Sequence, residues 1–152
     1  MTRCVPRRRH GADRSLAATF LRNAADFHHG GEAALTRHHE GARYFLAIAI
    51  ELALKAYLLD RGMSDDWNRF YLRHDLVKAL RFARRAGFTD APAKLSELAA
   101  LLSPYYRGHA VSEMSAETIG SVCWVEACTT VRALVDAVVE SAGADACREG
   151  EA

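Results

Sequence analysis

The sequence lacks any stretch in which apolar and polar residues alternate over the length of a strand, which excludes a predominantly β fold. Valine, isoleucine and threonine are sparse outside the last segment, whereas alanine, leucine, arginine and glutamate dominate and favour helices. The chain has no internal repeat, and its 152 residues suffice for one domain with a hydrophobic core. We therefore expect a single all-α domain, an up-down bundle of four to five helices.

Membrane spans and disulfides are also missing. The longest apolar run, Tyr44 to Asp60, is too short to span a bilayer and contains Glu51 and Lys55. The N-terminal arginines are not followed by the apolar region of a signal peptide. No CxxC pair occurs among the four cysteines, which are Cys4, Cys123, Cys128 and Cys147. Their spacing does not form a disulfide framework, so we expect a cytoplasmic protein that makes no membrane contact.

Positively charged residues outnumber negatively charged ones by only one. The formal net charge of +1 argues against a globally basic nucleic-acid binder, although a local basic patch remains compatible with it. Residues 1–14 contain five arginines against one aspartate, a local charge of +4. This basic arm either contacts nucleic acid or is a solvated terminus. We expect a flexible arm over residues 1–14, a helical bundle over 15–141 and a flexible tail over 142–152.

The segment from Tyr44 to Asp60 organises the predicted bundle. It is apolar on almost every side, which is typical of a helix that other helices enclose. Glu51 precedes Lys55 by four residues, the favourable order for a side-chain pair on a helix. Burial of these charges is costly unless they are paired. They either pair with each other, with His74 or with an arginine of the next helix, or they form a polar site at a dimer seam.

Glycine, proline and capping residues predict where the other helices begin and end. Gly30-Gly31 is expected to separate the first two helices, and Ser103-Pro104 to end the fourth. Met63 to Arg73 is expected to form a turn or short helix, and Tyr105 to Met114 a loop. The five predicted helices cover Ser15 to His29, Glu32 to Arg61, His74 to Ala86, Asp90 to Leu102, and Ala116 to Ser141 with Ser115 as its cap.

Two segments resemble the HEPN domain, a small helical module named for higher eukaryotes and prokaryotes nucleotide binding. They are AIELALKAYLLDRG at 49–62 and RHDLVKAL at 73–80, in the family's order and at its separation. The resemblance implies a bundle of four or five helices that commonly forms a homodimer. It also implies a role in prokaryotic toxin–antitoxin, phage-defence or RNA-processing systems, where an antitoxin or nucleotidyltransferase is a candidate partner.

Active members of that family resemble metal-independent ribonucleases in which an arginine is followed, after four to six residues, by a histidine near the start of a late helix. Here Arg107 and His109 are separated by a single residue. We therefore expect an RNA- or nucleotide-associated module without the family's usual cleavage activity. Two alternatives stay open, so that enzyme activity is undecided: a metal-independent endoribonuclease that uses Arg107 and His109, or a non-catalytic helical dimerisation or adaptor protein.

The candidate site residues come from the predicted loop and from the resembling segments. A metal-independent ribonuclease needs proton-transfer groups and a cation on the phosphate, which His109 and Arg107 suit, while a tyrosine can stack a base. The alternative for this loop is packed tyrosines with a solvated arginine and histidine. His74 and Asp75 either cap the third helix or form a site with Glu51. The candidate binding residues are Glu51, Lys55, His74, Asp75, Tyr105 and Tyr106.

No metal or other cofactor is predicted. His28 and His39 are eleven residues apart, a separation of about 16 Å if both lay in one helix. The glycine pair also separates His28 and His29 from His38 and His39.

Overall fold

The chain is a helical bundle in a computed structural model that describes residues 12–150. No strand occurs in that range, which confirms the predicted all-α class. Five helices contain ten residues or more: α1 (Arg14–Ala34), α2 (His39–Asp60), α4 (Leu76–Arg85), α5 (Leu95–Arg107) and α7 (Trp124–Glu149). The shorter elements are α3 (Asp65–Trp67), the π-helix η1 (Asn68–Leu72), the 3-10 helix η2 (Val111–Glu113) and α6 (Ala116–Gly120).

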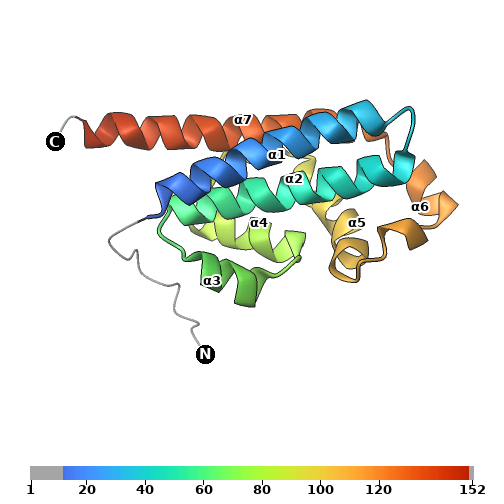
Figure 1. The fold of residues 1–152 in the computed structure, drawn as a ribbon, viewed down its shortest axis with the longest axis horizontal. Coiled ribbons are helices and arrows are strands. Elements are labelled where there is room, and N and C mark those ends of the chain that lie inside the picture. The colour runs from blue at the N-terminus through green and yellow to red at the C-terminus, as the bar shows by residue number, and fades with distance from the viewer. Residues whose placement is uncertain (1–11, 151–152) are drawn as a thin grey trace.

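Helix α2 lies at the centre and packs against α1, α4, α5 and α7 (Figure 1). Leu46, Ile50, Leu54 and Leu58 are fully buried, and residues 53–59 are buried without exception, so this half of the helix is enclosed on every side. The enclosed central helix predicted from its all-round apolar surface is therefore confirmed. No helix in residues 12–150 combines the length and the apolarity that crossing a bilayer requires.

The predicted break at Gly30-Gly31 is wrong, because α1 continues through both glycines to Ala34. The missing side chains allow α1 and α2 to approach closely. A Cβ atom on Gly30 would lie 3.2 Å from the Phe45 ring, and one on Gly31 would lie 3.3 Å from Leu46 Cδ2. The glycines therefore serve helix packing here, and the turn follows at residues 35–38.

The predicted stop at Ser103-Pro104 is also wrong, because α5 contains Pro104 and ends at Arg107. Proline removes one backbone donor near the helix end. The buried side chains of Leu102 and Tyr106, before and after Pro104, pack into the core and hold the last turn. Tyr105, Tyr106 and Arg107 thus belong to a helix and not to the predicted loop.

The last predicted helix is divided in two. Ser115 caps α6, as its side chain accepts a hydrogen bond from the Thr118 N–H, but α6 ends at Gly120. Extended backbone at Cys123 separates it from α7, and the Trp124 indole donates to the Ile119 carbonyl across this corner. Helix α7 continues past the predicted end at Ser141 to Glu149, where Arg61 pairs with Asp145.

Of the predicted basic arm, residues 1–11 lie outside the described range, as does Cys4. Arg14 already belongs to α1, whose first turn Asp13 caps through the Leu16 N–H.

Candidate functional site

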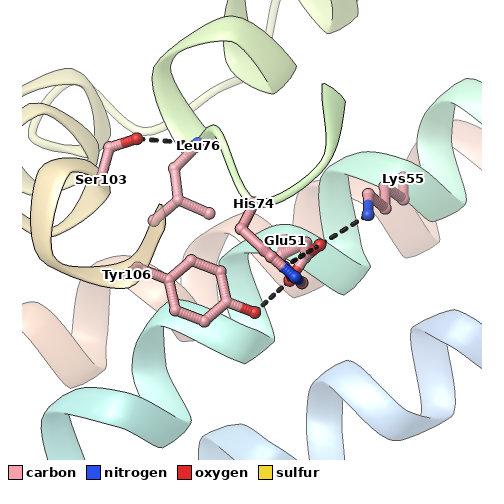
Figure 2. Close-up of polar contacts among 6 residues, drawn as sticks. All are labelled: Glu51, Lys55, His74, Leu76, Ser103 and Tyr106. Carbon is pink, nitrogen blue, oxygen red and sulfur yellow. Dashed lines mark hydrogen bonds and ion pairs between the residues drawn. The ribbon is translucent and has the colours of Figure 1, made fainter. Parts of the chain in front are cut away.

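Glu51 is the centre of a buried polar cluster on α2 (Figure 2). The residue is only 6% exposed, yet its carboxylate accepts hydrogen bonds from three donors. Lys55 Nζ lies 2.5 Å from Oε1, the Tyr106 hydroxyl donates to Oε2, and His74 Nδ1 lies 3.1 Å from Oε1. The predicted Glu51–Lys55 pair is therefore present, and the desolvation of the carboxylate is offset by contacts from two further segments.

Tyr106 remains a hydrogen-bond donor in this cluster over the usual pH range. Burial raises the pKa of its phenol, and the negative charge of Glu51 raises it further. The neutral phenol therefore donates to Glu51 and fixes the end of α5 against α2.

The π-helix η1 and the residue after it position His74. The Arg73 N–H closes the π-helix by donating to the Asn68 carbonyl, 3.1 Å away. Arg73 itself has φ 50° and ψ −121°, a backbone conformation that residues other than glycine rarely adopt. This turn brings the His74 ring back to Glu51, and π-helices are frequently found at functional sites.

Asp75 caps the N-terminus of α4, as predicted, and Ser103 holds this helix start against α5. The Asp75 carboxylate accepts from the Lys78 N–H at 3.0 Å, which is an ordinary N-cap. Ser103 Oγ accepts from the Leu76 N–H at 3.0 Å (Figure 2) and lies 3.4 Å from Asp75 Oδ1. The two sequence alternatives thus combine: Asp75 caps the helix, and the preceding His74 joins Glu51.

His109 lies beside His74 at the surface. The two ring centroids are 5.5 Å apart at an interplanar angle of 70°, and the Tyr106 ring lies 5.2 Å from that of His74. His109 has φ 53°, so its position depends on a second unusual backbone conformation. A hollow of about 250 Å³ opens beside His109, and its wall also includes Glu40 and Tyr44.

Arg107 reaches the same site from the last turn of α5. Its guanidinium lies 3.4 Å from Asp75 Oδ2, and both side chains have access to solvent. A solvent-exposed ion pair of this kind contributes little to stability, about 0–1 kcal/mol. The guanidinium can therefore exchange Asp75 for an anionic ligand at low cost.

Most of the predicted site residues come together around Glu51. Tyr105 is the exception, because it is only partly buried and packs against the hydrophobic core. Sequence reasoning missed Ser103 and Tyr44, whose ring lies 5.8 Å from that of Tyr106. Tyr44 precedes Glu51 by seven residues on the same side of α2, a spacing that could have identified it, whereas no local pattern indicates Ser103.

The groups of the cluster are suited to acid–base chemistry and to anion binding. Since Nδ1 of His74 faces a carboxylate, this nitrogen carries the proton, and Nε2 is left to exchange protons with a ligand. In the described part of the chain, no three histidine, cysteine or acidic residues are grouped to bind a metal. His28 instead donates through Nε2 to the Cys128 carbonyl at 2.9 Å, tying α1 to α7.

Comparison with known proteins gave no match to the chain among family models, curated proteins or solved structures. The HEPN relationship therefore stays a prediction that depends on residues 49–62 and 73–80.

Proposed function

We propose that this protein is an RNA-associated helical module that binds a phosphodiester at the surface of the Glu51 cluster. The observation that carries the proposal is the His74 ring, which a buried carboxylate orients so that one nitrogen is free beside His109. A ring held in this way is suited to contact a ligand phosphate or hydroxyl. The HEPN resemblance places such a module in a prokaryotic defence or toxin–antitoxin system, with a nucleotidyltransferase-type antitoxin as the partner to test.

Cationic and aromatic groups around His74 support RNA as the ligand. Arg107 can hold a phosphate after leaving Asp75, and a guanidinium recognises phosphate in a bidentate manner. Tyr44 lines the hollow next to His109 and offers a ring to a base or ribose. A nucleotide placed there would contact His109, whose ring lies beside that of His74.

The paired histidines favour a second candidate function, metal-independent RNA cleavage. One imidazole would remove the proton from the ribose 2′-hydroxyl, the 2′-oxygen would attack the adjacent phosphorus, and the second imidazole would protonate the departing 5′-oxygen. Arg107 would stabilise the additional negative charge on the phosphate. This assigns the proton transfer to His74 and His109 of one chain, with Arg107 as the cation on the phosphate.

The test measures RNA binding and RNA cleavage separately. Labelled RNA is titrated with the protein in EDTA at low salt for fluorescence anisotropy, and the same RNA is then incubated for gel analysis. We expect His74→Gln and Arg107→Ala to weaken binding several-fold, whereas His29→Ala on the exposed side of α1 serves as the matched control. Absence of binding by the wild type at low salt would contradict the proposal and leave an adaptor role.

Cleavage is the readout for the second candidate. If the wild type cleaves RNA in EDTA, His74→Ala and His109→Ala should each reduce the rate by at least about 100-fold, the usual contribution of a general acid or base. Binding without cleavage supports the module without nuclease activity. Cleavage that persists unchanged in both variants would exclude the histidine pair as its source.

A further inference from the structure

The most exposed phenylalanine and tyrosine residues of the described range occur on η1, a few residues before His74. Phe70 is 74% exposed and Tyr71 is 57% exposed. They belong to the segment that joins α3 to α4, and that segment lies at the edge of the bundle (Figure 1). Tyr71 precedes His74 by three residues, so their Cα atoms are at most about 11 Å apart.

Tyr71 is held rigid by an aromatic column that starts at the core. The Trp67 ring stacks on Tyr71 with centroids 5.4 Å apart at 27°, and it also meets Phe82 edge-on at 5.0 Å. Lys78 Nζ lies 2.6 Å from the Tyr71 carbonyl oxygen and fixes the backbone as well. One face of Tyr71 is therefore covered by Trp67, and the other is presented to solvent in a pre-organised orientation.

The sequence that carries these rings and follows them is basic. Residues 69–85 contain six arginine or lysine residues against one aspartate, a formal charge of +5 in a chain whose net charge is +1. The aspartate is Asp75, which is occupied by the Lys78 N–H and by Arg107. Arg69 and Arg73, which flank the aromatic pair, are both exposed. Two further acids, Asp65 and Asp66, lie earlier in the segment, in the first turn of α3.

Exposed rings among cations fit one class of ligand best. Single-stranded RNA offers unstacked bases to aromatic faces and a phosphate backbone to arginines, whereas a duplex keeps its base faces covered. A protein partner would match the rings, but it would also have to neutralise the arginines beside them. The charge therefore favours single-stranded nucleic acid over an apolar protein surface.

We propose that Phe70 and Tyr71 form a base-stacking subsite for single-stranded RNA, with Arg69 and Arg73 on its backbone. This inference rests on the proposed function and extends it. A base stacked on Tyr71 fixes the register of the strand, so that a neighbouring phosphodiester lies at His74. The subsite thereby determines which linkage reaches the histidine pair, and it makes the protein selective for single-stranded RNA over duplex RNA.

The experiment titrates a fluorescein-labelled RNA decamer, alone and as a duplex, by fluorescence anisotropy at low salt. We expect Phe70→Leu and Tyr71→Leu each to raise the Kd for the single strand about tenfold, in line with the loss of one stacked base. Tyr71→Trp should retain binding because it restores a ring. His29→Leu, which removes an exposed ring on α1, is the matched control and should leave the Kd unchanged. Circular dichroism checks that each variant remains folded.

A second readout detects stacking itself. A decamer that carries 2-aminopurine should lose fluorescence on binding the wild type and retain it on binding the Phe70→Leu/Tyr71→Leu protein. If RNA binding depends on His74 and Arg107 but not on Phe70 or Tyr71, the subsite is overturned and the proposed function stands. If the wild type binds no RNA, both are overturned. If Phe70→Leu and Tyr71→Leu alter sedimentation but not RNA binding, the two rings form a protein contact and the subsite is overturned.

Discussion

Glu51 is the residue on which the site depends, because one buried carboxylate accepts from α2, from α5 and from the segment before α4. Glutamine has one acceptor oxygen and an amide group that only donates. In Glu51→Gln the buried Lys55 ammonium therefore loses its counter-charge, and we expect the free energy of unfolding to fall by about 3–5 kcal/mol. Urea unfolding followed by circular dichroism measures this change.

Tyr106→Phe is the comparison for that measurement. It removes one donor and leaves the carboxylate paired with Lys55 and His74, so the expected loss is only about 1 kcal/mol. Equal losses in the two variants would show that Glu51 acts as a simple hydrogen-bond acceptor and that its charge contributes nothing.

Three buried groups predict loss of stability in alkali. Burial, reinforced by Glu32, raises the pKa of Cys128 to about 11, and burial also raises the pKa values of Tyr57 and Tyr106. The unfolded chain releases these protons from about pH 9 for the thiol and pH 10 for the phenols, whereas the folded chain retains them. Stability is therefore complete below pH 9. It should then fall by up to about 1.4 kcal/mol per pH unit for each group.

Urea midpoints at pH 8, 9, 10 and 11 check this pH dependence. Cys128→Ala should flatten the curve between pH 9 and pH 10 while the decline above pH 10 remains. An unchanged slope in that variant would exclude the Cys128 thiol as the group that titrates.

Local spacing was sufficient to predict the contacts made within a few residues along the chain. The four-residue step predicted the Glu51–Lys55 pair, and the histidine–aspartate step predicted the Asp75 cap. The Tyr106 contact depends on α5 continuing past Pro104, which the sequence argues against. The Ser103 contact depends on how α5 packs against the start of α4. Both contacts arise from tertiary packing, so the core of the site was only half predictable.

At the scale of helices, the sequence alone does not show whether a glycine ends a helix or lies within one. Gly30-Gly31 predicts a break, yet α1 continues because α2 packs directly against it. Gly62, in contrast, follows the end of α2, where its φ of 89° favours glycine. Helix existence was therefore predictable from periodicity. The boundaries depended on whether another helix approaches the glycine, which is a long-range property.

Two helical glycines give a matched prediction. A Cβ on Gly143 in α7 would meet nothing within 4 Å, so Gly143→Ala should raise the free energy of unfolding by about 0.5–1 kcal/mol through helix propensity. A Cβ on Gly31 would lie 3.3 Å from Leu46 Cδ2 and 3.4 Å from the Ala42 carbonyl oxygen. Gly31→Ala should therefore not raise the free energy of unfolding, because the added methyl group pushes α1 slightly away from α2. Thermal unfolding distinguishes the two, and equal stabilisation would contradict close packing of α1 on α2.

For the whole molecule, the central position of α2 explains why a site forms at all. A polar residue in the middle of an enclosed helix is reached from every neighbouring helix, so Glu51 can collect donors from distant parts of the chain. Charges on a peripheral helix would instead be solvated and would fix nothing. The same position makes the site sensitive to packing, because any shift of α5 or α4 against α2 moves Tyr106 or His74.

The remaining prediction concerns assembly. The outer side of α7 exposes Val125 and Val139, at 67% and 50%, and their separation of fourteen residues places them on one side of the helix. We expect a homodimer that pairs this side of α7 with its copy about a twofold axis, with the valines packing near its two ends and the exposed Arg132 and Asp136 between them available for ion pairs across it. Val125→Lys and Val139→Lys should each shift the protein to monomer in sedimentation velocity at micromolar concentration. Val77→Lys, at an exposed valine of α4, should leave the dimer intact. A wild-type monomer at that concentration would contradict the prediction, and RNA binding by the monomeric variants would show that each subunit carries a complete site.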